Sequence, residues 1–445
     1  MLRRALTSPI SRKTRKARRA AEIDNCWRFA REFNTIPAKS VLSMNESPIK
    51  ESPLVWENFV VASFARCGVD HFARVLEKHG LLAFYALGAR RGAKGVPPER
   101  TRLNPMFGLV NYLASNCLST YQGESLRFRL YPLFDRWLRS LLRPGQHLIT
   151  SFALGNSSMR WAKEHGGSTF IDAENSHPQV FWDLLTGEQK KWESPYPPVA
   201  PFYIKSCLET AGISDYAFAA SAFVRDSFVK QGWEPRRVLP YTLPLNLDWF
   251  KPAEIERPKS RPLTLLNTGS LCLRKGTPYL LEAFRLIRQK EPNAVLRLSR
   301  SVRDDVKSAL RRYADLPIEW SPFLNLRFED QRKKYVERFQ TSDIFVFPSI
   351  EDGFAYVVAE AMACGLPVIT TPNTGASDLV QSGVNGKVVP VQDPQAIADA
   401  VLKWWAKIKE GHRLQDIQKI RTALDVGTFE NTIMGHLAKL GLVNI

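Results

Sequence analysis

The stretch IFVFPSIEDGFAYVVAEAMACG, residues 344–365, decides the fold of this chain. It begins with four apolar residues typical of a buried strand, continues through a loop that contains Gly353, and ends in a helical pattern before Gly365. A strand, a glycine-containing loop and a helix in this order leave free backbone N–H groups at the helix start. Such a helix start attracts anions, phosphate among them.

Glu360 is the acidic residue in the helical part of this stretch, and its neighbours there are apolar. Residues 357–359 and 361–363 are all Val, Ala or Met. A carboxylate in such surroundings is costly unless hydrogen bonds satisfy it. Sugar or ribose hydroxyls would satisfy it without neutralising it. The alternative interpretation is a glutamate that caps or pairs within the core.

A basic loop precedes this stretch and follows a strand predicted over Leu263–Asn267. Residues 266–276 read LNTGSLCLRKG, which lacks the G-x-G-x-x-G spacing of a dinucleotide-binding turn. Instead, Arg274 and Lys275 stand directly before a glycine and a predicted helix. Cations at this place can neutralise a leaving diphosphate. A solvated basic turn is the alternative interpretation of the pair.

Strand and helix patterns alternate along the rest of the chain, which is typical of parallel α/β sheets. We predict a basic, partly disordered arm over 1–55, an acceptor-side domain over 56–250, a proline-rich linker over 251–262 and a donor-binding domain over 263–425. A C-terminal helix within 426–445 would pack back on the first domain. Two Rossmann-like parallel-sheet domains would then face a cleft, with ligands at the carboxyl ends of their strands.

Two local predictions are specific enough to be checked individually. Residues 100–145 are aromatic and basic, and we expect them to form helices inserted in the first domain. Within the second domain the pattern over Val302–Tyr313 predicts one continuous helix.

Composition and charge restrict the class of protein. The 445 residues are 44% hydrophobic and 24% charged, as in globular domains, and no apolar run approaches the ~18 residues that span a bilayer. The six cysteines have no paired spacing, so we expect neither a disulfide framework nor a zinc site, and a cytoplasmic location. Residues 1–20 contribute eight of the 62 basic residues and no acid. They are interpreted as a solvated tail, a transit peptide or an arm that binds anionic lipid or nucleic acid.

Residues 263–400 together resemble the family 4 (group 1) glycosyltransferases, which have the two-domain GT-B fold. The matching stretches are residues 269–284, 346–349, 352–368, 373–380 and 383–386. In the first half the resemblance is looser. It implies transfer of a hexosyl-type sugar from a nucleotide-diphosphate sugar to an acceptor hydroxyl, with retention of anomeric configuration. It also implies a role in polysaccharide or glycolipid biosynthesis.

The resemblance also implies roles for individual residues. Lys275 and Arg274 would contact the diphosphate, Glu360 the ribose, and Asp352 the hydroxyls of the transferred sugar. The donor site would further include Gly269, Ser270, Gly353, Phe354, Ala355 and Tyr356. In the first domain His177 would contact the donor sugar or phosphate, although a histidine hydrogen-bonded in its loop is the alternative. No Asp-x-Asp motif is present, so we expect no metal and no cofactor besides the UDP- or GDP-sugar substrate.

Three positions depart from the family pattern. Asp352 stands where the family has the first of two glutamates, and Glu351 beside it is out of register. Ser270 replaces an arginine, which removes one cation from the phosphate site, and Arg274 is a candidate substitute. Ala355 replaces a glycine, which narrows access to the backbone. These departures leave the identity of the donor sugar open.

The predicted partners are the nucleotide-sugar donor and a carbohydrate or lipid-linked acceptor. The excess of basic over acidic residues fits peripheral contact with an anionic membrane on the cytoplasmic face. Nucleic acid is disfavoured as a partner. Two other functions remain open at this point. One is a sugar-nucleotide epimerase or another enzyme on the GT-B fold, and the other is a non-catalytic protein that binds anionic ligands.

Overall fold

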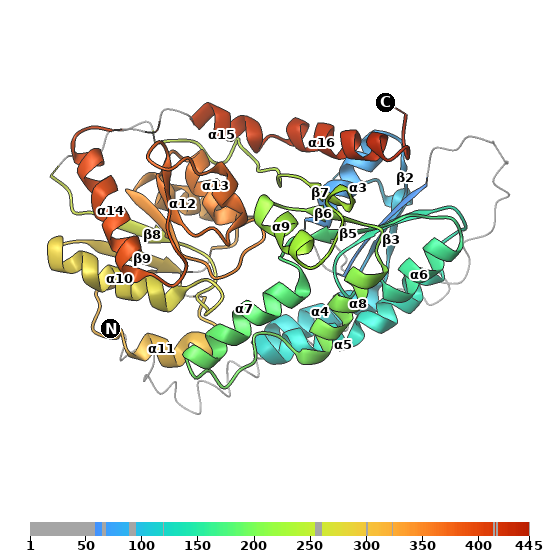
Figure 1. The fold of residues 1–445 in the computed structure, drawn as a ribbon, viewed down its shortest axis with the longest axis horizontal. Coiled ribbons are helices and arrows are strands. Elements are labelled where there is room, and N and C mark those ends of the chain that lie inside the picture. The colour runs from blue at the N-terminus through green and yellow to red at the C-terminus, as the bar shows by residue number, and fades with distance from the viewer. Residues whose placement is uncertain are drawn as a thin grey trace.

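The computed structural model describes residues 58–64, 68–88, 95–118, 120–253, 260–299, 301–322, 324–412, 414 and 417–444. The predicted arm over 1–55 lies outside the described residues. The described chain forms two parallel sheets with helices packed around them, one sheet in each half of the sequence (Figure 1). This arrangement confirms the predicted α/β class with two parallel-sheet domains.

The first sheet has seven strands in the order β3-β2-β1-β4-β5-β6-β7, and all neighbours are parallel. Its strands are β1 (Phe59–Ser63), β2 (Leu82–Leu87), β3 (Thr101–Leu103), β4 (His147–Thr150), β5 (Thr169–Ala173), β6 (Tyr216–Ala219) and β7 (Val238–Pro240). Strands β1 and β5 are buried along their whole length, because helices cover both faces of a parallel sheet.

The helices of this half are α3 (Val69–Lys78), α4 (Pro105–Cys117), α5 (Thr120–Arg139), α6 (Asn156–Glu164), α7 (Pro178–Lys191), α8 (Pro201–Ile213) and α9 (Ala222–Lys230). The helices expected within residues 100–145 are therefore α4 and α5. Phe107 of α4 and Phe134 of α5 are buried with their ring centroids 5.3 Å apart. Tyr131 and Trp137 are partly buried against the same core. The core role expected for the aromatic residues of this stretch therefore holds for these four.

The second sheet has six strands in the order β10-β9-β8-β11-β12-β13. They are β8 (Thr264–Asn267), β9 (Val295–Ser299), β10 (Ile318–Ser321), β11 (Ile344–Phe347), β12 (Val368–Thr370) and β13 (Gly386–Val388). The helices are α10 (Thr277–Lys290), α11 (Lys307–Arg311), α12 (Glu329–Gln340), α13 (Tyr356–Ala363), α14 (Pro394–Lys409), α15 (Ile417–Ala423) and α16 (Val426–Lys439).

The single helix predicted over Val302–Tyr313 is wrong in its first part. Val302 forms an isolated bridge with Leu271, and the Arg303 amide donates to the Leu271 carbonyl at 2.9 Å. This pairing holds the chain extended, so helical structure begins only with a short 3-10 turn at Asp304–Val306, followed by α11. A contact with a distant loop therefore overrides the local helical pattern.

At the boundary between the two halves, one helix from each half packs against the other half. The C-terminal helix α16 returns to the first domain, where its Phe429 ring lies 5.4 Å from that of Phe72 in α3 (Figure 1). In the opposite direction, Leu185 of α7 is buried in the hydrophobic core of the second domain. Glu188 of the same helix is fully buried and accepts hydrogen bonds from the Tyr279 hydroxyl of α10 at 3.0 and 2.9 Å. These are two of the places at which the domains contact each other.

Candidate active site

The basic and acidic loops singled out in the sequence follow adjacent strands and meet at one edge of the second sheet. Strand β8 pairs with β11 in parallel, so their carboxyl ends lie side by side. The Arg274 carbonyl then accepts hydrogen bonds from the Ile350 amide at 2.9 Å and the Ser349 hydroxyl at 3.0 Å. The two loops therefore form one unit at the start of α13.

Lys275 and Asp352 form an ion pair within this unit. Their side chains are 15% and 13% exposed, and the second Asp352 oxygen accepts from the Ala355 amide at 3.0 Å. Burial alone would raise the pKa of Asp352, but the charges of Lys275 and Arg274 outweigh it and lower that pKa. Burial and the neighbouring Arg274 lower the pKa of Lys275. The pair places one ammonium and one carboxylate at the predicted donor site.

Ala355 immediately precedes α13 and has a left-handed backbone, with φ 66° and ψ 70°. For an alanine this conformation costs roughly 1 kcal/mol, since the Cβ crowds the following carbonyl oxygen. No side chain caps the N-terminus of α13. A helix start without a side-chain cap can attract an anion, and the anion site expected here from the sequence stays a prediction. The family's glycine would adopt this geometry without the strain.

The loop between β11 and α13, residues 348–355, is called the donor loop below. Gly353 lies where this loop contacts the first domain. A Cβ at this position would overlap the carbonyl oxygen of Glu174, so only glycine fits. The Ser221 hydroxyl, at the start of α9, donates to the Gly353 carbonyl at 2.7 Å. Contacts from two segments of the first domain therefore fix the loop that precedes α13.

Arg274 contacts this domain boundary as well. Its guanidinium donates to the Glu351 carboxylate at 3.0 Å and to the side-chain oxygen of Asn175 at 3.4 Å. Glu351 is fully buried and also accepts from the Ser176 amide at 2.9 Å. Although burial opposes its charge, Asp352 and Glu351 raise the pKa of Arg274. Contact of Arg274 with a diphosphate stays a prediction. Glu351 links the two domains, a role that the sequence did not reveal.

His177 immediately precedes α7 and caps it. Its Nδ1 accepts from the Gln179 amide at 3.3 Å, and its ring meets that of Phe228 edge-on at 5.0 Å. Burial lowers the pKa of His177 to about 4, so the ring is neutral near pH 7. These contacts match the alternative interpretation of a loop histidine. Glu174 and Ser176, which precede His177, both contact the loop before α13. A donor contact of His177 stays a prediction.

Glu360 lies on α13 and has a protein partner. The Tyr335 hydroxyl of α12 donates to Glu360 Oε2 at 2.8 Å, and the Glu360 residue is 9% exposed. Burial raises the pKa of Glu360 to about 8, against the opposing effect of this hydrogen bond. The sequence left open whether Glu360 pairs within the protein. One of its carboxylate oxygens does so, with Tyr335. Tyr335 itself belongs to no motif that sequence reasoning could have used.

Gly269 and Ser270 lie on the other side of the basic loop and are exposed. Gly269 has φ 112°, a backbone conformation that favours glycine, and its amide donates to the Ser299 hydroxyl at 3.3 Å. The Ser270 hydroxyl lies 3.3 Å from that of Ser301. Both predicted donor residues therefore lie at the carboxyl ends of β8 and β9, beside the Lys275 loop.

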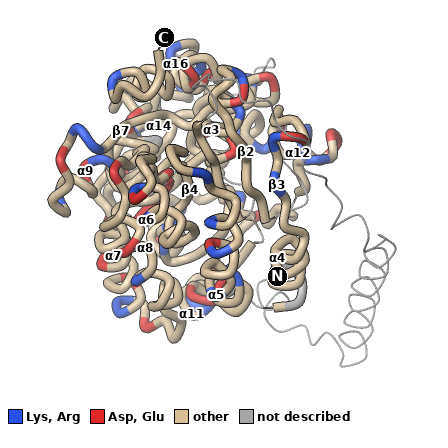
Figure 2. Tube along the Cα trace, turned by 90° about the vertical axis from the view of Figure 1, so that its right-hand side faces the viewer, with Lys and Arg blue, Asp and Glu red and all other residues tan. Residues whose placement is uncertain are grey.

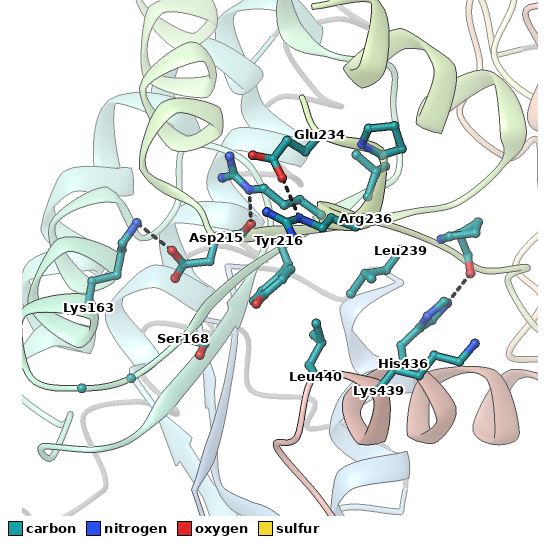
Figure 3. Close-up of a pocket in the computed structure, with 16 residues that line it drawn as sticks. Lys163, Ser168, Asp215, Tyr216, Glu234, Arg236, Leu239, His436, Lys439 and Leu440 are labelled. Carbon is teal, nitrogen blue, oxygen red and sulfur yellow. Dashed lines mark hydrogen bonds and ion pairs between the residues drawn. The ribbon is translucent and has the colours of Figure 1, made fainter. Parts of the chain in front are cut away.

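A large hollow of about 1040 Å³ lies elsewhere, at the amino ends of β5, β6 and β7 beside α16 (Figure 3). Three of the four Lys and Arg side chains that line it have partners. Lys163 pairs with Asp215 at 2.8 Å, Arg236 pairs with Glu234 at 2.6 Å, and Arg237 donates to the Asp215 carbonyl at 2.7 Å. Ligands of parallel α/β sheets bind at the carboxyl ends of strands. We therefore place the candidate site at the loops around Lys275 and not in this hollow.

Comparison with known proteins identifies the second domain. Residues 262–407 match the family model described as glycosyl transferases group 1. This segment contains the four charged side chains predicted to hold the donor from the second domain, which are Arg274, Lys275, Asp352 and Glu360. The match supports a glycosyltransferase.

Curated relatives agree with this match. The chain is 27% identical over 151 residues to the amylovoran biosynthesis glycosyltransferase AmsK of Erwinia amylovora, covering 32% of this chain and 36% of that protein. It is 25% identical over 275 residues to the putative glycosyltransferase EpsD of Bacillus subtilis, covering 59% and 66%. Each match spans less than two thirds of the relative's own length.

Solved structures match over both domains. Sucrose-phosphate synthase from Thermosynechococcus elongatus superposes with a TM-score of 0.59 and 14% identity, over 86% of this chain and 99% of that one. Anabaena Alr3699/HepE in complex with UDP and glucose superposes with a TM-score of 0.54 and 14% identity, also over 86% and 99%. The predicted GT-B fold is thereby confirmed.

Proposed function

We propose that this protein is a glycosyltransferase that moves a hexosyl-type sugar from a UDP- or GDP-sugar to an acceptor hydroxyl, with retention and without a metal. One observation carries the proposal. The ammonium of Lys275 lies beside Asp352 at the uncapped start of α13, within the segment that matches the group 1 glycosyl transferases. A cation beside the start of a helix suits a nucleotide diphosphate.

The leaving group is the main chemical demand on this site. When the bond from the anomeric carbon to the phosphate oxygen breaks, negative charge accumulates on the departing diphosphate. We expect Lys275 and the start of α13 to stabilise that charge. One such pre-positioned donor typically lowers the barrier by about 3 kcal/mol. Asp352, freed from part of its contact with Lys275, would accept hydrogen bonds from sugar hydroxyls.

Retention follows from front-face transfer. The acceptor oxygen approaches the anomeric carbon on the face that the phosphate leaves, and the departing phosphate oxygen takes the acceptor hydroxyl's proton. The new carbon–oxygen bond and the proton transfer thus balance without a protein base. Glu360 would hold the ribose of the donor, at the opposite end of the diphosphate from Asp352. The cation and the amides would take the place of a metal.

The acceptor is expected at the carboxyl ends of the first sheet, opposite the donor loops. AmsK is named for amylovoran biosynthesis, and CapM of Staphylococcus aureus is named for capsular polysaccharide biosynthesis. The name of CapM supports a carbohydrate or lipid-linked acceptor. Among the described residues, no helix is long and apolar enough to cross a bilayer. In the view of Figure 2, Lys and Arg lie interspersed with Asp and Glu, on α9 and α12 among other elements. We expect peripheral contact with an anionic membrane to be made by the basic arm over 1–55.

A screen of sugar nucleotides by thermal shift, followed by product analysis with the best donor, tests the proposal. We expect one UDP- or GDP-sugar to raise the melting temperature, and nucleotide release to require an acceptor. Conversion of the donor without any acceptor would favour an epimerase. If no sugar nucleotide shifts the melting temperature while anionic vesicles bind tightly, the protein is instead a binder of anionic ligands.

A further inference from the structure

Tyr335 is the hydrogen-bond partner of Glu360, and the motifs of the site do not include it. The two residues face each other across α12 and α13, with the hydroxyl 2.8 Å from Glu360 Oε2. Among the described residues, no other hydrogen bond reaches this carboxylate. One carboxylate oxygen therefore has a protein partner, and the other is available to a ligand.

We propose that Tyr335 is a positioning residue for the donor. Its hydroxyl fixes one oxygen of Glu360, so that the second oxygen is presented to the ribose diol of the nucleotide sugar. This inference rests on the proposed function and deepens it. A glutamate has several rotatable bonds, and fixing them on binding costs roughly 1.5–2 kcal/mol of side-chain entropy. A carboxylate fixed beforehand avoids most of this cost at the moment of binding.

The ring of Tyr335 is itself fixed by aromatic neighbours. It meets Phe339 edge-on at 5.2 Å within α12 and Phe250 edge-on at 6.3 Å. Phe250 lies in the segment that leaves the first domain, and its carbonyl accepts from the Arg421 guanidinium at 2.6 Å. The ring is thus packed against Phe339 of α12 and against Phe250 in the connection between the domains. A residue so anchored can orient a carboxylate that has few contacts of its own.

The groups around Glu360 make this role measurable through pH. From its own helix, burial raises the pKa of the Cys364 thiol to about 12, so Cys364 stays neutral. From α15, Arg421 acts on Cys364, and from α12, Arg338 acts on Tyr335. The hydrogen bond from Tyr335 opposes the effect of burial on Glu360. Removing the hydroxyl should therefore raise the pKa of Glu360 further.

The sign of the pH effect follows from the chemistry of the ribose. The diol donates hydrogen bonds, so the ionised Glu360 binds it better than the neutral acid. Donor affinity is then full above the pKa of Glu360 and falls as the pH drops through it. In Tyr335→Phe the midpoint of this fall should move to higher pH. A tyrosine with a purely structural role would not move it.

The experiment measures donor affinity of the full chain between pH 6 and 10, with the sugar nucleotide that stabilises the wild type. Tyr335→Phe keeps the ring and should weaken binding about tenfold near pH 8, the value of one lost hydrogen bond to a charged group. Turnover at saturating donor should stay within about twofold, because the contact is made before and during the reaction alike. Tyr313→Phe is the matched control, since that hydroxyl bonds the Glu282 carboxylate in the same domain. It should change neither affinity nor midpoint.

Glu360→Gln gives a second measurement that does not depend on the tyrosine variant alone. It should remove the pH dependence of donor binding assigned to this carboxylate, and Tyr335→Phe added to it should then shift no midpoint. If the wild type binds a sugar nucleotide and Tyr335→Phe binds it with the same affinity and midpoint, the role of Tyr335 is refuted. If the wild type binds none at any pH, the proposed function itself fails.

Discussion

Replacing Lys275 by methionine removes the ammonium that faces Asp352 while keeping much of the side-chain volume. The remaining Asp352 side chain is 13% exposed, so its carboxylate becomes a nearly buried charge. Removing one partner of a buried ion pair typically costs 3–5 kcal/mol. Arg274 and the Ala355 amide remain near Asp352 and compensate in part. We therefore expect the free energy of unfolding to fall by about 2–4 kcal/mol.

The same change should affect the reaction separately. Loss of the cation at the leaving diphosphate should cost about 3 kcal/mol of barrier, or roughly a hundredfold in turnover. A double variant distinguishes the two effects. Lys275→Met with Asp352→Asn leaves no unpaired charge, so most of the stability should return. Turnover should stay low, because the cation is still missing.

Urea denaturation gives the stability, and product formation from the best sugar nucleotide gives the turnover. Asp352→Asn alone is the control for the carboxylate. Recovery of both stability and wild-type turnover in the double variant would refute the assignment of Lys275 to the leaving group. A Lys275→Met variant as stable as the wild type would refute the energetic importance of the ion pair.

Three further predictions concern other parts of the molecule. Ala355→Gly should relieve the strain of the left-handed backbone, while the greater freedom of glycine in the unfolded chain offsets part of the gain. We expect the free energy of unfolding in urea to stay equal or to rise by up to about 1 kcal/mol. A clear loss of stability would mean that the strain is not present. Glu188→Ala should remove the acceptor for Tyr279 and Gln392 at the domain boundary and lower stability by about 2–3 kcal/mol, with Glu193→Ala as an exposed control. We expect a larger radius of gyration in small-angle scattering to accompany that loss. An unchanged free energy of unfolding would show that the Glu188 contacts do not hold the domains together. Turnover should survive EDTA, whereas loss of activity restored by Mg²⁺ or Mn²⁺ would show that a metal contributes to the diphosphate site.

The sequence alone predicted the parts of the site that follow from strand order. The loops after β8 and β11 meet because the carboxyl ends of adjacent parallel strands share one edge. Local apolar and glycine patterns identify such strands and loops, so Lys275 and Asp352 could be placed at one site without a structure. The departure at Ala355 was also visible, although its left-handed backbone was not.

Only the tertiary structure decided which groups those residues contact across long sequence separations. Ser176 and Glu351 are 175 residues apart and meet because the two domains dock, which no local pattern encodes. Likewise, Tyr335 reaches Glu360 because α12 packs beside α13, and α7 enters the core of the second domain. Local periodicity determines which face of an element is apolar, but the partner of a polar side chain depends on how elements pack. The sequence therefore located the loops of the donor site, and packing determined how their charges are paired.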